Sequence, residues 1–314
     1  MQYRILGRTG LKVSAISLGG LFFGELAKGR DSSKTMARAA ELGINLIDTA
    51  IGYKGSEEDI GKSLTDLKLR NQFILCTKWW PYQKDGKTLL QDPVLLRRAV
   101  EESLGRLRTD HLEVLLFHSL TFAGDVVAVA SGPLMEEVHR LKSEGKLGFV
   151  GLSNPGDYDT EDARLTEAAQ SGSFDVVMPE FLLFRNRAVR NTLPIYKKCN
   201  VGVISIIPLG QAAWGYGLRD RQYLVDSLKA LREKGKLPER EPYTLESVLD
   251  FLLDQQSPTI ASAALRFCLS YPEISTVCCG TNNPEHLEQN AATADSEPYG
   301  EERLARALEL FGTL

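Results

Sequence analysis

Short hydrophobic runs alternate with amphipathic stretches along nearly the whole chain. Eight of the runs lack the strict alternation of a half-exposed strand, which is typical of strands buried on both faces of a parallel sheet. We therefore expect strands at Ala15–Leu18, Asn45–Asp48, Phe73–Lys78, Leu112–His118, Gly148–Ser153, Asp175–Pro179, Gly202–Ile207 and Ser275–Gly280.

Helical spacing of apolar residues fills the intervals between these runs. Ser32, Ser56, Asp92 and Asn283 are the expected N-caps, because each precedes a proline or an acidic first turn. The expected helices are Ser33–Leu42, Glu57–Leu67, Pro93–Leu107, Pro133–Ser143, Asp159–Ser171, Ala188–Lys198, Thr259–Ser270 and Pro284–Ala292, followed by a last one at Glu301–Phe311.

Eight strand–helix alternations predict an α/β fold, a (β/α)8 TIM barrel in one domain over residues 1–314. An open doubly wound sheet is the alternative, although that fold usually has fewer strands. Tyr3–Val13 reads as an N-terminal β-hairpin that caps the bottom of the barrel. Gly210–Ser257, after the seventh strand, is too long for an ordinary loop and contains helical pieces near Arg221–Glu233 and Leu245–Gln255, so a lid or cofactor clasp is expected.

The composition narrows the class of protein. The chain has 314 residues, of which 43% are hydrophobic, and a net charge of −4, so no basic field attracts nucleic acid or anionic lipid. No apolar stretch reaches the roughly 18 residues that span a bilayer, and the first residues lack the apolar region of a signal peptide. Five cysteines without a CxxC pair fit free thiols in a reducing compartment. We expect a cytoplasmic protein.

Common cofactor and metal motifs are missing. The sequence has no GxGxxG, and Gly55–Ser63 has one residue too many for a phosphate-binding P-loop. The four histidines share no metal-ligand spacing, so no metal site is expected. Any dinucleotide must therefore be bound by other means than a Rossmann fingerprint.

Four titratable residues stand where predicted strands end. Asp48, Lys78 and His118 close the second, third and fourth runs, and Tyr53 follows Asp48 by five residues. All strand ends of a parallel barrel open on one face, so these side chains are expected to converge. Alone, each would be read as a strand-end ion pair or a buried histidine.

Together the four residues suggest acid–base chemistry on a carbonyl group. An ammonium beside a phenol favours the phenolate, so Lys78 is expected to lower the pKa of Tyr53. Asp48 would neutralise and orient Lys78, which would otherwise be an unpaired buried charge. Tyr53 would then protonate a carbonyl oxygen as a hydride arrives at its carbon, and His118 would hydrogen-bond the same oxygen.

The chain resembles the aldo-keto reductase superfamily over essentially its whole length. The resemblance lies in Leu6–Ser14, Asp48-Thr49-Ala50 with Tyr53, Thr77-Lys78, Leu116-Phe117-His118, Gly151-Leu152-Ser153-Asn154, Pro208-Leu209-Gly210, and Gly280-Thr281 with Glu288-Gln289-Asn290. It implies a nicotinamide cofactor extended across the top of the barrel and a catalytic tetrad of Asp48, Tyr53, Lys78 and His118.

The resemblance also implies which residues bind the cofactor. Ser153 and Asn154 would contact the nicotinamide carboxamide, with Gly20 and Asp48 close to the cofactor as well. Pro208, Leu209 and Gly210 would begin the pyrophosphate clasp. The adenosine end would be surrounded by Gly280, Thr281, Asn282, His286, Gln289 and Asn290.

Some positions depart from the family pattern. Met178 stands where a glutamine usually holds the carboxamide, and Ile206 where an aromatic usually stacks on the nicotinamide. The two exchanges are expected to weaken cofactor binding by about 1–3 kcal/mol. The basic residues that usually meet a 2′-phosphate are missing at Gly280, Asn282 and His286, so NAD(H) is possible although the family favours NADP(H).

These features predict an NAD(P)(H)-dependent oxidoreductase of aldehydes and ketones, whose oligomeric state the sequence leaves open. Loop aromatics follow several strand ends, and Phe22 and Trp79 are expected to line the substrate pocket with Tyr53 and His118. Two alternatives remain: an NAD-dependent aldose (sugar) dehydrogenase, and a cofactor-sensing regulatory subunit similar to ion-channel β subunits.

Overall fold

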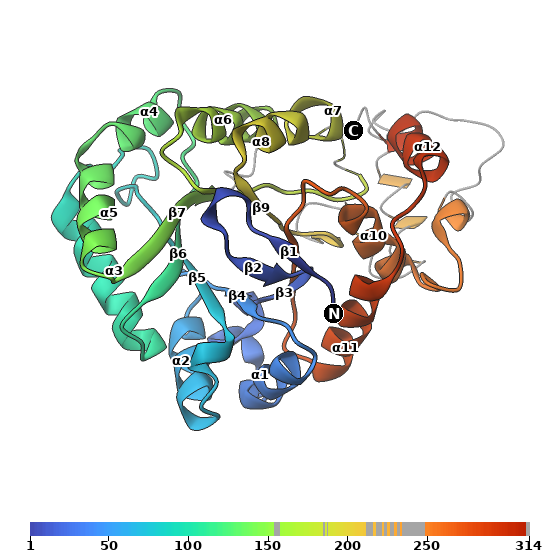
Figure 1. Cartoon of the computed structure of the whole chain (residues 1–314), viewed down its shortest axis with the longest axis horizontal. Helices are drawn as coiled ribbons and strands as arrows, with labels where there is room; N and C mark the ends of the chain where they lie inside the picture. The colour runs from blue at the N-terminus through green and yellow to red at the C-terminus, as the bar shows by residue number, and fades with distance from the viewer. Residues whose placement is uncertain are drawn as a thin grey trace.

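A computed structural model describes residues 1–153, 158–184, 186, 188–211, 216–217, 222, 225–226, 229–230, 233 and 249–311. Eight parallel strands close into one barrel in the order β12-β3-β4-β5-β6-β7-β8-β9 (Figure 1). The strands coincide with the eight hydrophobic runs, so the predicted barrel is confirmed. They are β3 (Ile16–Gly19), β4 (Leu46–Asp48), β5 (Ile74–Trp79), β6 (Leu112–His118), β7 (Leu147–Ser153), β8 (Val176–Met178), β9 (Gly202–Ser205) and β12 (Thr276–Gly280).

Helices surround the barrel (Figure 1). They agree with the predicted ones to within a few residues: α1 (Ser32–Glu41), α2 (Ser56–Asp66), α3 (Pro93–Leu107), α5 (Pro133–Ser143), α6 (Tyr158–Ser171), α10 (Ile260–Leu269), α11 (Pro284–Ala292) and α12 (Glu301–Phe311).

The helical layer differs from the prediction in two places. The single helix expected at 188–198 is divided into α7 (Ala188–Asn191) and α8 (Leu193–Cys199). Pro194 lies in the first turn of α8 and cannot continue a preceding helix. The short helix α4 (Asp125–Ala130) was not predicted, because its three valines have low helix propensity.

Two of the four predicted helix caps are wrong. Asp92 and Asn283 cap α3 and α11, each accepting a hydrogen bond from the backbone N–H two residues later. In α1, however, Asp31 is the cap, and α2 begins after a glycine. The Ser32 hydroxyl donates instead to Asp59, and the Ser56 hydroxyl donates to the Gly20 carbonyl, so both serines join separate segments.

The predicted N-terminal hairpin is confirmed. β1 (Tyr3–Ile5) pairs antiparallel with β2 (Lys12–Ser14), and the hairpin lies across the centre of the barrel in Figure 1. Leu6 and Val13 pack with Val114 and other interior side chains, so the hairpin closes the end of the barrel where the strands begin.

Side-chain alternation decides which residues reach the interior. In β5, Cys76 packs in the interior cluster with Leu46 and Leu116, whereas Trp79 belongs to the outer cluster beneath the helices. Because successive side chains of a strand point to opposite faces, Lys78 shares the interior side of Cys76. The interior is therefore apolar at the bottom and charged near the strand ends.

The long connection after β9 is described only in part. Its first pieces are β10 (Gly210–Gln211) and β11 (Tyr216–Gly217), which pair antiparallel. The helix expected at 221–233 lies largely outside the described residues. The described part of the second, 249–255, holds a 3-10 helix at Asp250–Leu252 rather than an α-helix. Across the described residues, no helix has the length and apolar character that crossing a membrane requires.

The contact between α2 and α3 generates a testable prediction. A Cβ placed on Gly61 would lie 2.2 Å from the Arg106 carbonyl oxygen, whereas one on Gly105 would meet nothing within 4 Å. We expect Gly61→Ala to lower the free energy of unfolding by about 1–3 kcal/mol, since the helices must separate. Gly105→Ala is the control, expected to be neutral or to stabilise by up to about 1 kcal/mol. Equal effects of the two variants in urea unfolding would contradict this packing.

Candidate active site

A buried ion pair lies inside the barrel near the ends of β4 and β5. The Lys78 ammonium donates to Asp48 Oδ2 at 2.5 Å and to the Thr49 carbonyl oxygen at 2.8 Å. The Lys78 and Asp48 side chains are 2% and 5% exposed. Burial alone would lower the pKa of Lys78, but the charge of Asp48 and then that of the Tyr53 phenolate that forms at high pH outweigh it and raise this pKa above its ordinary value. Lys78 is therefore a fixed cation.

Tyr53 lies in the turn between β4 and α2, beside this cation. Its hydroxyl is 3.4 Å from Lys78 Nζ, and the ammonium is 4.8 Å from the centre of its ring. Backbone hydrogen bonds from Tyr53 N to the Ala50 carbonyl and from Ser56 N to the Tyr53 carbonyl hold the turn.

The expected direction of the Tyr53 pKa shift is wrong. Burial raises the pKa of Tyr53 above its ordinary value, and the nearby ammonium of Lys78 offsets this only in part. A phenolate would lose most of its hydration here, and one cation already paired with a carboxylate does not compensate for that loss. The phenol is consequently protonated at neutral pH, which is the form that a proton donor needs.

His118 completes the group from the end of β6. Its ring centre is 6.3 Å from that of Tyr53, in an edge-to-face arrangement. Burial, and then the positive charge of Lys78, lower the pKa of His118 to about 4. The imidazole is neutral at pH 7, so it can donate a hydrogen bond without carrying charge. The structure thus brings Asp48, Tyr53, Lys78 and His118 together.

Sequence reasoning missed a second buried carboxylate that braces this group. Glu57, in the first turn of α2, is 2% exposed and accepts a hydrogen bond from Thr77 Oγ1 at 2.6 Å. Its other oxygen accepts from Arg106 Nε at 2.7 Å. Thr77 precedes Lys78, so Glu57 joins the helix that follows Tyr53 to the strand that carries the cation. The only signal in the sequence was a glutamate four residues after Tyr53.

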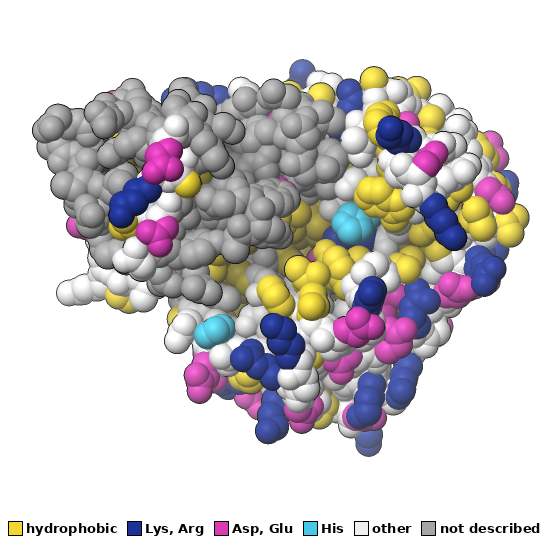
Figure 2. All heavy atoms as spheres, turned by 180° about the vertical axis from the view of Figure 1, so that it is seen from behind, with side chains coloured by type: hydrophobic (Ala, Val, Ile, Leu, Met, Phe, Trp, Pro, Cys, Tyr) yellow, Lys and Arg dark blue, Asp and Glu magenta, His cyan; other side chains and the backbone are white. Residues whose placement is uncertain are grey.

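Of the two tryptophans at the end of β5, Trp80 rather than Trp79 faces the site. Trp79 is 7% exposed and packs against Phe117 in the outer layer. Trp80 is 45% exposed, and its ring centre is 6.0 Å from that of His118. The sequence could have indicated this, because successive side chains of a strand point to opposite faces. Since Lys78 points into the barrel, Trp79 points outward. Figure 2 shows the face turned away from the viewer of Figure 1, where hydrophobic side chains gather beside a histidine.

Several residues expected to bind a cofactor lie on neighbouring strand ends. Ser153 is opposite His118 on one side and Met178 on the other, and its hydroxyl is 3.7 Å from the Met178 sulfur. Asn154 lies outside the described residues. Gly280 pairs with Gly19, and the Phe22 ring lies next to Gly280, where a Cβ would be 3.2 Å from it. The structure therefore puts Phe22 on the β12 side of the barrel.

The backbone beyond β9 is strained where the pyrophosphate clasp is expected. Ile207 has a φ of 58°, a conformation that is rare for a β-branched residue, and Gly210 has a φ of 72°. A hydrogen bond from Gly210 N to the Ile207 carbonyl closes a tight turn containing Pro208 and Leu209. Strain of this kind often accompanies ligand-binding segments.

The residues expected at the adenosine end include no lysine or arginine. Asn282 is 5% exposed, and its Nδ2 donates to the Ser32 hydroxyl at 3.0 Å. Asn282 Oδ1 is buried and has no hydrogen-bond partner among the described residues. Thr281 accepts from Asn283 N. On α11, His286 and Gln289 are exposed and Asn290 is partly exposed. Gly20 lies next to Asp48, since a Cβ on it would be 3.0 Å from the Asp48 carbonyl oxygen.

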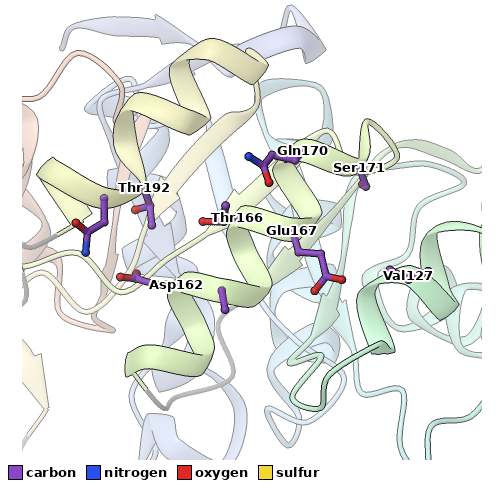
Figure 3. A pocket seen from close by; sticks show the side chains of 9 residues that line it. Val127, Asp162, Thr166, Glu167, Gln170, Ser171 and Thr192 are labelled. Atoms are coloured by element: carbon purple, nitrogen blue, oxygen red, sulfur yellow. The ribbon is translucent and has the colours of Figure 1, made fainter.

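A groove in the helical layer is a separate feature. It has a volume of about 630 Å³ and lies between α4 and α6, reaching Thr192 before α8. Figure 3 shows Asp162, Thr166 and Gln170 of α6 along it. None of the four converging residues lines this groove, so the barrel mouth is the candidate active site.

Comparison with known proteins agrees with this geometry. The model of the aldo/keto reductase family matches residues 15–310. L-galactose dehydrogenase of Arabidopsis thaliana is 31% identical, over 96% of this chain and 90% of that protein. Among solved structures, the holo form of an aldo-keto reductase from Bacillus halodurans has a TM-score of 0.75 at 24% identity, covering 100% of this chain and 97% of that one. An aldo-keto reductase from Klebsiella pneumoniae in complex with NADPH has a TM-score of 0.73 at 23% identity, covering 100% and 96%.

The resemblance noted from the sequence motifs is therefore confirmed. The family match covers nearly all of the barrel, from the start of β3 to the last helix. The solved structures agree with the same fold over the whole chain. The chain belongs to the aldo/keto reductase family of oxidoreductases.

Proposed function

We propose that this protein is an NAD(P)(H)-dependent oxidoreductase that reduces aldehydes and ketones to alcohols, with Tyr53 as the proton donor. The observation that carries the proposal is the 3.4 Å distance between the Tyr53 hydroxyl and Lys78 Nζ, with Lys78 held by Asp48. A neutral phenol beside a fixed cation can release its proton to a carbonyl oxygen, because the ammonium stabilises the phenolate that forms.

The proposed roles of the other groups follow from their charge states. Neutral His118 would donate a hydrogen bond to the substrate oxygen and orient the carbonyl group. Asp48 would keep Lys78 charged and in place during the reaction. A bound nicotinamide would supply or accept the hydride.

The chain offers suitable residues for that cofactor. Ser153 would bind the carboxamide with Asn154, beside Met178 and Ile206, and the strained turn from Pro208 to Gly210 would hold the pyrophosphate. The buried Asn282 Oδ1 lacks a partner among the described residues, which fits a ligand that supplies a donor. Gly280, Thr281, His286, Gln289 and Asn290 would surround the adenosine, and Gly20, next to the Asp48 carbonyl, would lie close to the cofactor.

The choice between NADP(H) and NAD(H) separates two candidate functions. The family and the NADPH complex of a structural neighbour favour NADP(H) and a carbonyl reductase. The likeness to L-galactose dehydrogenase and the lack of a lysine or arginine at Gly280, Asn282 and His286 favour an NAD-dependent aldose dehydrogenase. Dissociation constants for the two cofactors decide: tight NADP⁺ binding with poor NAD⁺ binding would count against the sugar dehydrogenase.

A regulatory subunit that only senses the cofactor is a weaker candidate. Such a protein has no need for a proton donor braced by a buried ion pair and a second buried carboxylate. Turnover of 4-nitrobenzaldehyde at ordinary enzymatic rates would exclude a purely regulatory role.

The proton-donor assignment predicts the behaviour of Tyr53→Phe. The variant should retain less than about a tenth of wild-type carbonyl reduction, because general acid catalysis typically contributes about 100-fold or more. Cofactor binding, measured by fluorescence titration, should be nearly unchanged since the ring remains. Turnover above that level with intact cofactor binding would show that another group donates the proton.

His118 predicts a pH dependence of stability. The imidazole has a pKa of about 4 in the folded protein and about 6.5 when unfolded, so the unfolded chain binds more protons between these values. This residue should therefore remove up to about 3 kcal/mol from the free energy of unfolding as pH falls from 6.5 to 4. His118→Gln should lose less stability over that range in urea titrations. Parallel curves for the variant and the wild type would refute the neutral state of the His118 imidazole in the folded protein.

A further inference from the structure

The segment after β5 forms a small folded-back loop with a buried tyrosine. Tyr82 is bridged to Leu89, and backbone hydrogen bonds from Gln83 N to the Thr88 carbonyl and from Leu90 N to the Pro81 carbonyl close the loop. The Tyr82 side chain is 4% exposed. It points away from its own loop and toward the segment that follows His118.

The Tyr82 hydroxyl joins these two loops through both of its hydrogen-bonding functions. It donates to Asp125 Oδ2 at 2.5 Å and accepts from the Thr121 backbone N at 2.6 Å. The same carboxylate oxygen accepts from Phe122 N at 2.9 Å. Burial, and then Asp125, raise the pKa of Tyr82 to about 12, so the hydroxyl keeps its proton. The Asp125 carboxylate and the Tyr82 hydroxyl therefore hold the loop after His118 in place through these hydrogen bonds.

Two large aromatic rings pack against the ring of Tyr82. Its ring centre is 5.3 Å from that of Trp80 and 5.9 Å from that of Phe122. These neighbours are 45% and 41% exposed, and Trp80 also reaches to 6.0 Å from His118. Half-exposed aromatic rings beside a buried polar group are typical of a surface that packs against a ligand.

We propose that Tyr82 is a positioning residue that holds Trp80 and Phe122 as a preformed wall beside His118, and that this wall makes the site selective for carbonyl compounds bearing an aromatic ring. The inference rests on the proposed carbonyl reduction. Flat apolar rings offer an aromatic substrate offset-stacked or edge-to-face contacts, which a small aliphatic carbonyl cannot use. Fixing the rings before binding reduces the entropy lost when the substrate enters.

The hydroxyl of Tyr82 can be tested separately from its ring. Tyr82→Phe keeps the ring and removes both hydrogen bonds, which frees the two loops to move apart. Its ratio of kcat/KM for 4-nitrobenzaldehyde to kcat/KM for propanal should fall by about fivefold or more, mostly through KM for the aromatic aldehyde. Asp125→Asn should shift the ratio in the same direction, since the strong acceptor is lost.

Tyr271→Phe is the matched control. Tyr271 is 8% exposed, and its hydroxyl has no hydrogen-bond partner among the described residues. Its backbone carbonyl accepts from Arg4 of the N-terminal hairpin, at the other end of the barrel. The control should preserve the substrate ratio.

The outcomes distinguish the two proposals. A wild-type protein that reduces neither aldehyde with either cofactor would refute the proposed function and this inference with it. An active wild type whose substrate ratio is unchanged in both Tyr82→Phe and Asp125→Asn would refute the inference alone. An equal fall in both variants and in Tyr271→Phe would also refute it, because the effect would then be one of general stability.

Discussion

The ammonium of Lys78 and the carboxylate of Asp48 lie 2.5 Å apart inside the barrel, where neither side chain is more than 5% exposed. Each charge would be very costly to bury alone, so each residue needs the other. The Lys78 ammonium of this pair lies beside Tyr53, where it partly offsets the effect of burial, and its charge helps to keep His118 neutral. One ion pair thus affects the protonation states of both Tyr53 and His118, the two residues that we propose act on the substrate carbonyl.

The surrounding fold fixes where this pair can act. Parallel strands place Asp48, Lys78 and His118 at one end of the barrel, and the hairpin closes the other end. Glu57 joins the helix after Tyr53 to the strand of Lys78, and Tyr82 joins the loop after β5 to the loop after His118. Buried polar side chains therefore hold together the segments that converge on the site, and the hydrophobic layers hold the barrel itself.

Sequence patterns were sufficient for the barrel and for the convergence of four titratable residues. Hydrophobic runs ending in Asp48, Lys78 and His118 place these groups at strand ends without any knowledge of packing. The direction of the Tyr53 pKa shift was not predictable, because it depends on burial by residues distant in sequence. The hydrogen bonds by which Glu57 and Tyr82 join separate segments were not predicted for the same reason: their partners lie 20 or more positions away. Trp80 could have been chosen over Trp79 from strand alternation alone.

A double-mutant cycle for Asp48→Asn and Lys78→Met, read as free energy of unfolding, tests the central ion pair most directly. Each single variant leaves a buried group without its partner and should cost about 3–5 kcal/mol. The double variant should be more stable than the sum of the two losses predicts, by about 2 kcal/mol or more. Losses that add to within about 0.5 kcal/mol would contradict the account, because the two charges would then be independent.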